Sequence, residues 1–397
     1  MIVEEYMQTP VREQCDVLVC GGGFAGISAA LAASRQGKKV ILLEKQFILG
    51  GLATAGLVTI YLPLCDGYGR QVSFGIAEEL FRLSISMGAE ENYPANWLDG
   101  EGSRTEHDPR FEVQFNPSLF AMLVEELLQK ENVQILYGTY AVAVGKQDDR
   151  IDTVIVENKS GRYAIRPKTV VDATGDCDIG YFAGAPTESF RQGNVLAAWY
   201  YGLDEKGYAL HTLGFCDIPE EEKKNRKAPP VLHNQRFSGL DGKELSQMVQ
   251  LSHSSTLEDI RRKRKDHPGL IPTSLATIPQ IRMTRRIAGE YTLTNADNHK
   301  TQPDSVGMVS DWRKRGPVYE VPFGTLYSRK VKNLICAGRC TSSTDEVWDM
   351  MRVIPCCAVT GQAAGTAAAL TEDFTRMDIA RLQAALRENG VRIHEGD

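Results

Sequence analysis

Four glycines near the amino terminus have the spacing that brings a phosphate onto protein backbone. Gly21, Gly23 and Gly26 form a G-x-G-x-x-G pattern, and Gly22 completes a run of consecutive glycines. In this pattern the first glycine permits a tight turn, the second lets a pyrophosphate approach, and the third lets a helix pack closely on a strand. The phosphate then lies at a helix N-terminus, where free N–H groups favour an anion. The pattern predicts an adenine-dinucleotide site, with a purely structural glycine turn as the alternative.

The residues around these glycines complete a βαβ unit. Residues 17–20 form a β-rich run, an alanine-rich helix former follows the glycines, and a second strand over 39–43 ends at Glu44. A carboxylate at that position can accept hydrogen bonds from a ribose hydroxyl pair, whereas a ribose 2′-phosphate would require arginine. Residues 17–34 carry no charge, but their glycines argue against a membrane helix.

Three arginines in the middle of the chain could bind a carboxylate. Arg282, Arg285 and Arg286 gather three guanidinium groups. A guanidinium binds a carboxylate through two parallel hydrogen bonds. The alternative is that they form structural ion pairs with Glu290 and Asp297.

Composition and charge narrow the class of protein. The chain has 397 residues and a formal net charge of −6, which gives room for two or three domains but no broad basic surface for nucleic acid. Basic runs at 223–227 and 261–265 have acidic neighbours and are interpreted as solvated helix faces. The amino terminus shows no apolar secretory segment, so we expect a cytoplasmic protein without a membrane partner. Nine scattered cysteines, without a C-x-x-C pair or a metal-ligand spacing, fit a reducing compartment and predict no metal site.

Apolar periodicity and turn residues divide the rest of the chain. They predict a helix from about residue 117 and strands over 133–137, 140–144, 151–158, 162–166 and 169–172. Residues 61–110 are irregular and are interpreted as an insertion. Mixed periodicity between 187 and 316 indicates a second domain, after which a strand, a loop and a helix return to the first. We therefore predict a discontinuous domain over 1–186 and 317–397 that encloses a second domain over 187–316.

Two further glycine pairs are interpreted as helix-packing positions. Gly180-x-x-x-Gly184 and Gly361-x-x-x-Gly365 lack the strand that precedes a dinucleotide fingerprint. The second pair lies in the uncharged run 353–370, which we expect to be a buried helix. No separate nicotinamide domain is therefore predicted.

The order of these blocks resembles the FAD-dependent oxidoreductases of the two-dinucleotide-fold type, especially a bacterial group distantly related to the fumarate reductase and succinate dehydrogenase flavoproteins. The likeness covers residues 16–58, 75–83, 116–186 and 279–370. It implies an α/β fold with a discontinuous, Rossmann-like FAD/NAD(P)-binding domain and an inserted α+β substrate (cap) domain.

The resemblance also implies which residues hold FAD. The histidine-containing motif for covalent attachment is absent between residues 44 and 58, so non-covalent FAD is expected. The matching positions are Gly21, Gly22, Gly23, Phe24, Ala25, Gly26, Glu44, Lys45, Gly50, Gly51, Leu52, Ala53, Thr54, Ala141, Val142, Ala173, Thr174, Gly175, Asp176, Gly338, Arg339, Arg352, Val353 and Ile354. The helix that opens at Val353 would direct its positive end at the flavin pyrimidine and raise the flavin reduction potential.

The catalytic candidates are Arg285, Asp345 and Arg352. Members of the bacterial group commonly have a histidine at the position of Asp345, upstream of the R-x-x-P arginine, which is Arg352 here. Asp345 could be the base and Arg352 a substrate or flavin contact, or the two could form a buried structural pair. His299, with a surface or core role as the alternative, and the cysteines Cys65 and Cys177 are weaker candidates.

These observations predict an FAD-dependent oxidoreductase that transfers a hydride between a small polar substrate and flavin N5. The three arginines favour a carboxylated substrate, and the electron acceptor is left open. One alternative is an FAD-binding protein that uses flavin structurally or as a sensor without redox turnover. Another is an NAD-binding dehydrogenase built on the same βαβ unit, which the glycine-rich segment near residue 50 and the A-T-G-D segment argue against.

Overall fold

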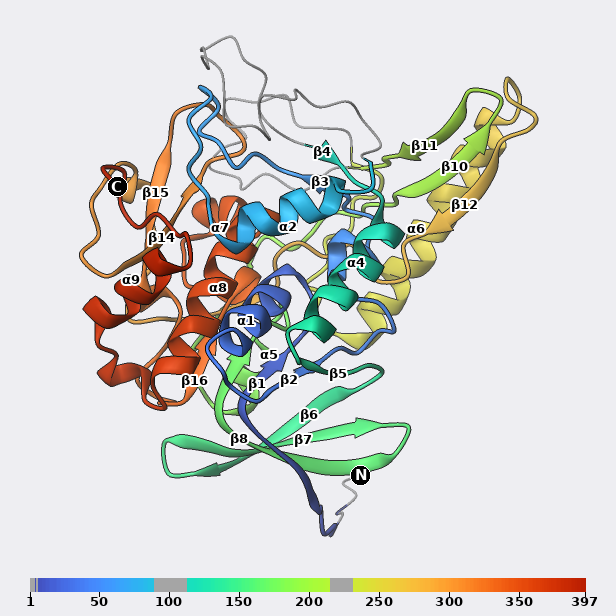
Figure 1. Ribbon diagram of the computed structural model, residues 1–397. Coiled ribbons are helices and arrows are strands. Elements are labelled where there is room, and N and C mark those ends of the chain that lie inside the picture. Colours follow the sequence, from blue (N-terminus) through green and yellow to red (C-terminus); the bar gives the residue numbers. More distant parts are fainter. Residues whose placement is uncertain (1–3, 5, 89–112, 215–230) are drawn as a thin grey trace.

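A parallel sheet lies at the centre of the computed structural model, which describes residue 4 and residues 6–88, 113–214 and 231–397. Its strand order is β5-β2-β1-β8-β16, formed by Gln134–Leu136, Val40–Leu43, Val11–Cys20, Gly161–Asp172 and Leu334–Cys336 (Figure 1). Strands β2 and β16 and the last four residues of β1 are continuous buried apolar runs, which is typical of parallel strands that are covered on both faces. This arrangement confirms the predicted Rossmann-like α/β class.

Two helices with small side chains pack together against the sheet. A Cβ added at Gly361 or Gly365 of α8 (Ile354–Leu370) would lie 2.2 Å from the carbonyl oxygen of Ala25 or 2.1 Å from that of Ala29 in α1 (Phe24–Ser34). The predicted close packing is therefore confirmed for this pair. The same prediction is wrong for Gly184. Its φ is +71° and no atom lies within 4 Å of an added Cβ, so this glycine serves a turn and not helix packing.

In the described part of the chain no single helix is long and apolar enough to cross a membrane. Only α7 (Asp345–Met351) and α8 pass such a test jointly, as a pair bent by 88°.

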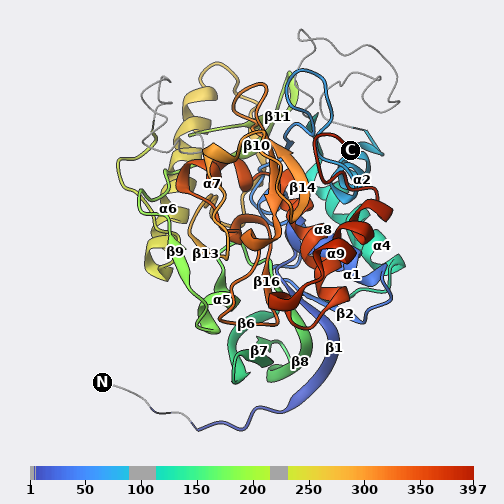
Figure 2. The same ribbon diagram turned by 90° about the vertical axis from the view of Figure 1, so that its left-hand side faces the viewer.

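The amino-terminal half of β8 belongs to an antiparallel meander with β6 (Tyr140–Gln147) and β7 (Arg150–Asn158). The predicted strands over 162–166 and 169–172 are one continuous strand, because β1 pairs with it from Ala164 to Asp172, while β7 pairs with its first part and β16 with its last. Figures 1 and 2 both place this meander at the opposite end of the molecule from β10 and β11.

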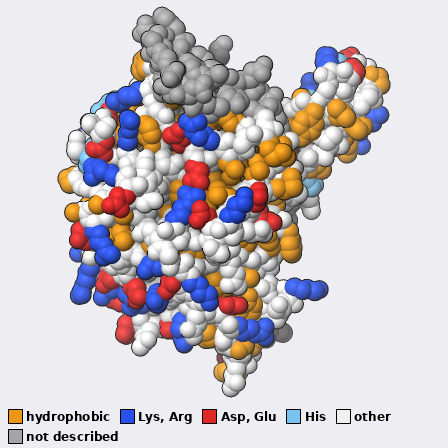
Figure 3. Space-filling model, in the orientation of Figure 1, with side chains coloured by type: hydrophobic (Ala, Val, Ile, Leu, Met, Phe, Trp, Pro, Cys, Tyr) orange, Lys and Arg blue, Asp and Glu red, His pale blue; other side chains and the backbone are white. Residues whose placement is uncertain are grey.

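The segment after β8 builds an arm that projects from the body (Figure 1). The arm consists of β10 (Tyr200–Asp204), β11 (Gly207–His211), β12 (Ile271–Leu275) and helix α6 (Gly242–Lys263). Asp241 caps α6 by accepting hydrogen bonds from two backbone N–H groups. On the face shown in Figure 3, hydrophobic side chains gather on and beside the arm, while acidic and basic side chains are interspersed elsewhere.

The remaining elements surround the sheet and close the chain. Strand β9 (Thr187–Ser189) pairs with β13 (Arg285–Ile287), β3 (Ile60–Tyr61) with β4 (Val113–Gln114), and β14 (Ser305–Ser310) with β15 (Val318–Pro322). The other helices are α2 (Ile76–Ile85), α4 (Pro117–Lys130), α5 (Asp178–Phe182) and α9 (Ile379–Glu388), with short 3₁₀ turns at Gly51–Ala53, Asn295–Asp297, Phe323–Thr325, Gly338–Cys340 and Phe374–Arg376. The predicted domain limit at 316/317 falls inside the β14–β15 pair, which contacts α8 and α9. Of the predicted insertion over 61–110, residues 89–110 lie outside the described residues.

Candidate active site

A cavity of about 740 Å³ lies at the carboxyl ends of β1, β2, β8 and β16. Ligands of open α/β sheets bind at this end of the strands. The lining includes these residues predicted to hold the cofactor: Gly21, Gly22, Gly23, Phe24, Ala25, Glu44, Lys45, Gly50, Gly51, Leu52, Ala53, Ala141, Ala173, Thr174, Gly175, Asp176, Gly338, Arg339, Arg352 and Ile354. The fold thus brings residues from distant parts of the chain to one site.

Four residues predicted to hold the cofactor are not in this lining. Gly26 packs beneath the first turn, and Val142 lies within β6. Thr54 is buried, and its hydroxyl donates a hydrogen bond to the carbonyl of Leu49. Val353 is the N-cap residue of α8. These residues are placed to support the wall of the cavity.

The three motif glycines differ in the space around them. A Cβ at Gly21 would lie 2.3 Å from the carbonyl oxygen of Ala173, and one at Gly26 would lie 1.8 Å from that of Gly21. Gly21 also has a φ of +109°, which L-residues rarely adopt. Gly23 has no atom within 4 Å of such a Cβ and lines the cavity. Two glycines are therefore needed by the fold, whereas the third leaves open backbone that fits a pyrophosphate.

Glu44 closes the same turn from the end of β2. Its carboxylate accepts hydrogen bonds from the backbone N–H groups of Gly22 at 2.8 Å and Gln46 at 2.7 Å. Burial raises the pKa of Glu44 above its usual value, although these hydrogen bonds act in the opposite direction. A buried carboxylate at the strand end, beside the glycine turn, fits the ribose contact that the sequence predicted.

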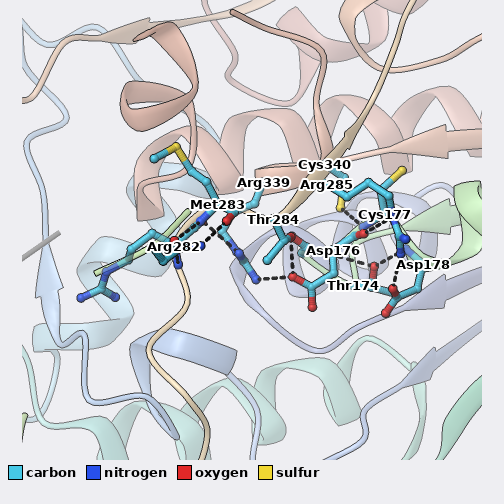
Figure 4. Close-up of polar contacts among 12 residues, drawn as sticks. Thr174, Asp176, Cys177, Asp178, Arg282, Met283, Thr284, Arg285, Arg339 and Cys340 are labelled. Carbon is cyan, nitrogen blue, oxygen red and sulfur yellow. Dashed lines mark hydrogen bonds and ion pairs between the residues drawn. The ribbon is translucent and has the colours of Figure 1, made fainter. Parts of the chain in front are cut away.

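Asp176 connects the turn after β8 to two other segments (Figure 4). Its Oδ1 accepts a hydrogen bond from the Thr284 hydroxyl at 2.8 Å and lies 3.4 Å from the guanidinium of Arg339. Arg339 also donates to the carbonyl oxygen of Arg282 at 2.9 Å. A Cβ at Gly175 would lie 2.4 Å from the same guanidinium, so this glycine makes room for Arg339.

Arg352 lies where α8 begins, on the cavity lining. Its Nε donates to Asp349 Oδ1 at 2.9 Å, and the side chains of Arg352 and Asp349 are 8% and 1% exposed. The α8 N-terminus opens beside it with Pro355 in the first turn. The guanidinium and the helix dipole together give this part of the cavity a positive character.

A buried charge network extends from Asp349 into the protein. Asp311 and Arg313 form a two-pronged ion pair with both N···O distances at 2.9 Å. Arg313 Nη1 lies 3.7 Å from Asp349 Oδ2 and donates to the carbonyl of Glu346 at 2.9 Å. The alternating charges hold Asp349, and through it Arg352, in one position.

Arg285 is directed away from the cavity. It donates to Asp178 Oδ1 at 2.7 Å and to the carbonyl oxygen of Asp176 at 3.0 Å, and its guanidinium lies 4.1 Å from the centre of the Tyr181 ring. It is absent from the cavity lining, although Asp178 is present there. The structure therefore places this predicted carboxylate-binding arginine behind the wall.

Arg286 and Asp345 bind each other at 2.8 Å, and Arg286 also binds Glu188 at 2.9 Å. The predicted Asp345–Arg352 pair is therefore wrong, because Asp349 lies one helical turn after Asp345 and takes Arg352. Asp345 is not in the cavity lining.

Arg285 and Arg286 form structural ion pairs, but the partners predicted for the arginine cluster are wrong. Glu290 binds Arg329 at 2.8 Å, and Asp297 caps its own turn through Thr294. The arginines of β13 instead bind Asp178 in α5, Glu188 in β9 and Asp345 in α7. Local sequence could not reveal these partners, because Asp178 lies 107 positions from Arg285 and Glu188 lies 98 positions from Arg286.

The other polar candidates lie apart from the cavity. His299 pairs with Glu395 at 2.8 Å and its side chain is 48% exposed. Cys65 is buried, and its carbonyl accepts a hydrogen bond from Ser310. Cys177 is buried behind the turn after Asp176.

The wall opposite the glycine turns lies in the predicted second domain, but none of its residues was identified from the sequence. Helix α6 and the segment after β12 supply it, and Asp178 joins the floor. Leu245, Met248 and Val249 do have helical apolar spacing, which could have identified one buried face of α6. The additional lining residues are Cys20, Leu43, Gln46, Thr139, Tyr140, Asp178, Gly239, Leu245, Ser246, Val249, Gln250, Thr277, Ile278, Pro279, Ile281, Ala337 and Cys357.

The sheet, the glycine turn and the acid after β2 define a dinucleotide-binding protein. The chain belongs to the FAD dependent oxidoreductase family, whose model matches residues 16–198 and 200–386. This membership confirms the predicted family, the FAD cofactor and the enzyme class.

Curated relatives and solved structures resemble parts of the chain. It is 24% identical over 192 residues to a fumarate reductase (cytochrome) of Shewanella frigidimarina, covering 41% of this chain and 34% of the relative. It is 27% identical over 219 residues to an L-aspartate oxidase of Mycobacterium tuberculosis, covering 47% of this chain and 40% of the relative. The chain thus matches well under two thirds of these relatives. A geranylgeranyl bacteriochlorophyll reductase-like protein of Thermoplasma acidophilum aligns with 15% identity and a TM-score of 0.47 over 96% of this chain and 85% of that one.

Proposed function

We propose that the protein transfers a hydride between a small carboxylated substrate and N5 of FAD, and that Arg352 binds the substrate carboxylate. The observation that carries this proposal is that Arg352 lines the same cavity as the glycine turns. Bound FAD supplies a hydride donor or acceptor at N5. The protein then has to orient the substrate and exclude water.

The surroundings of Arg352 support a role in binding an anion. Its Nε and one Nη bind Asp349, which leaves the orientation of the guanidinium fixed before a ligand arrives. The α8 N-terminus favours negative charge at the same place. Two relatives are named for reactions of fumarate and of L-aspartate, both carboxylates, which agrees with this choice of substrate class.

Arg352 is a better candidate for carboxylate recognition than Arg285. Arg285 already binds Asp178 and lies outside the cavity lining. Asp345, the predicted base, is held by Arg286. The proposal therefore assigns substrate recognition to Arg352 and assigns proton transfer to none of these residues.

Anaerobic mixing of the FAD-loaded protein with a panel of small mono- and dicarboxylates tests the proposal. Oxidised and pre-reduced protein are both used, and flavin absorbance reports transfer in either direction. A reactive carboxylate should change the absorbance rapidly, whereas its neutral amide should react at least about tenfold more slowly, because a charge-assisted bidentate contact contributes ~1.5–3 kcal/mol.

Arg352→Met should slow the reaction by a similar factor, while Arg352→Lys should recover part of it. Arg285→Met is the matched control and should react as the wild type does, provided that its FAD content is unchanged. If no carboxylate oxidises or reduces the flavin, or if Arg352→Met reacts at the wild-type rate, the proposal is wrong. If no carboxylate changes the flavin absorbance, the remaining interpretation is that the protein uses FAD structurally or as a sensor.

A further inference from the structure

Three thiols and one carboxylate meet behind the turn that follows β8. Asp172 ends β8, Cys177 follows the turn, Cys336 ends β16, and Cys340 ends the next 3₁₀ turn. Cys336 stands beside Asp172 on the neighbouring parallel strand, and all four side chains are fully buried. Figure 4 shows Cys177 and Cys340 next to this turn. We call these four residues the thiol cluster.

Two distances within the thiol cluster, and the close grouping of three of its four residues, resemble those of a metal site. The sulfurs of Cys177 and Cys336 lie 3.9 Å apart, and Cys340 Sγ lies 3.9 Å from Asp172 Oδ1. One oxygen of Asp172 and the sulfurs of Cys177 and Cys336 all lie within 4.8 Å of one another. A tetrahedral zinc ion with Zn–S bonds of ~2.3 Å places two sulfurs about 3.8 Å apart.

Backbone N–H groups surround the thiol cluster and would stabilise its negative charge. The N–H of Cys177 points at Cys340 Sγ at 3.2 Å. The N–H groups of Gly180 and Thr174 donate to the two oxygens of Asp172 at 2.9 and 3.1 Å. Such outer contacts orient metal ligands and offset the charge of thiolates.

The backbone at Cys177 favours a different residue. Its φ of 52° and ψ of 41° are left-handed, a conformation that glycine adopts at little cost and cysteine does not. Gly180 makes room for this thiol, because a Cβ there would lie 2.7 Å from Cys177 Sγ. The backbone conformation at position 177 therefore does not favour a cysteine. The contact between the sulfurs of Cys177 and Cys336 is a reason for a thiol at this position.

We propose that Cys177, Cys336, Cys340 and Asp172 bind one zinc ion, which fixes the turn that forms the cavity floor. Thiolates select zinc over harder cations, and four protein ligands leave no open position for chemistry. On binding, each of the three S–H bonds is replaced by a Zn–S bond and its proton leaves to solvent. The site is independent of the proposed reaction. Spacing along the sequence could not reveal it, because its ligands come from two segments more than 150 positions apart.

Zinc retention by the full-length, FAD-loaded protein tests the proposal. The reduced protein is incubated with zinc chloride, desalted and analysed for zinc and FAD. We expect one zinc ion per chain, and at least about tenfold weaker binding for Cys336→Ser, because each lost ligand removes a metal bond. Cys356→Ser, which changes a buried cysteine in α8, is the matched control and should retain zinc.

Cys177→Gly separates the loss of a ligand from the loss of the fold. Glycine suits the left-handed backbone there, so this variant should lose zinc but keep its FAD, and it should have the unfolding midpoint of the zinc-free wild type. A folded wild type that retains no zinc would overturn the proposal, as would a Cys177→Gly variant that binds zinc as the wild type does. A Cys177–Cys336 disulfide found by mass in untreated, zinc-free protein would also overturn it.

Discussion

The two walls of the cavity are built in different ways. The first wall consists of backbone turns, and its glycines lie so close to neighbouring carbonyl groups that two of the three motif glycines leave no room for a Cβ. The second wall consists of side chains from α6 and from residues 277–281. The first wall suits a cofactor whose phosphates need bare N–H groups, whereas the second can change its side chains without disturbing the fold.

The packing behind the walls differs in the same way. The first wall rests on the main sheet and on the tightly packed α1–α8 pair. The second rests on a small apolar cluster formed by Met248, Leu196, Phe237 and Ile281. We therefore expect substitutions in the first wall to affect folding and FAD binding, and substitutions in the second to affect mainly the substrate.

Gly26→Ala should have the largest effect. Its new Cβ would meet the carbonyl oxygen of Gly21 at 1.8 Å, and backbone at this position cannot move without displacing α1 from the sheet. We expect a loss of ~3 kcal/mol in the free energy of unfolding, the upper part of the range for overpacked cores, together with loss of FAD. Urea unfolding of the flavin-free protein measures this directly, and an unchanged midpoint would contradict the account of the first wall.

Gly23→Ala should separate FAD binding from folding. Its Cβ would enter open space in the cavity, so the flavin-free protein should unfold within ~0.5 kcal/mol of the wild type. FAD affinity should fall at least about tenfold, or ~1.4 kcal/mol, because the methyl group occupies the approach of the pyrophosphate. Fluorescence titration with FAD measures the affinity.

Gly242→Ala is the control for Gly23→Ala. It makes the same chemical change at another open glycine, at the start of α6 and outside the cavity lining. It should leave FAD affinity unchanged. Equal losses of affinity in both variants would mean that the first wall is not the phosphate site.

Asp178→Asn should change the pH dependence of stability. Burial raises the pKa of Asp178 to about 6, the charges of Asp176 and Asp172 add to this, and Arg285 opposes it. The unfolded carboxyl titrates near ~3.9, so the folded state retains its proton over this window. Ionisation of Asp178 therefore lowers the stability of the wild type as the pH rises from ~4 to about 6, and the effect is constant above that range.

The amide cannot ionise, so the variant should lack this part of the decline. Urea midpoints measured at several pH values across the window, for wild type and variant, give the comparison. Parallel curves for the two proteins would show that Asp178 does not titrate there.

Val249→Ala in the second wall should have only a small effect on the cofactor. The side chain lines the cavity on α6 and is half-buried. We expect FAD affinity to change by less than about threefold, or ~0.7 kcal/mol. The substrate concentration at which flavin reduction or oxidation is half-maximal should change more than the affinity for FAD. A larger effect on FAD than on the substrate would remove the distinction between the two walls.

The sequence predicted the first wall because its chemistry is local. Gly21 to Gly26 and Glu44 lie next to the strands that position them, and the turn chemistry demands those residue types. The turn 173–176 also follows a predicted strand, but its role was implied by the resemblance to the flavoprotein family. The family confirms the fold and the cofactor.

Most contacts that the sequence did not reveal join distant segments, whereas the missed Arg352–Asp349 pair spans three positions. Arg285 meets Asp178, and Arg352 is held through Asp349 by Arg313, because β13 and the β14–β15 connection approach the sheet in space. Many carboxylates were available to each arginine, and only the tertiary arrangement selects one. The α6 wall was missed for the same reason.

The most direct test of this account is an absorption spectrum of the purified protein, followed by acid precipitation and chromatography of any released flavin. The account predicts a flavin spectrum, free FAD in the supernatant at about one molecule per chain, and a lower FAD content in Gly23→Ala. Folded protein that neither contains nor takes up FAD, or flavin that remains on the precipitated chain, would contradict it.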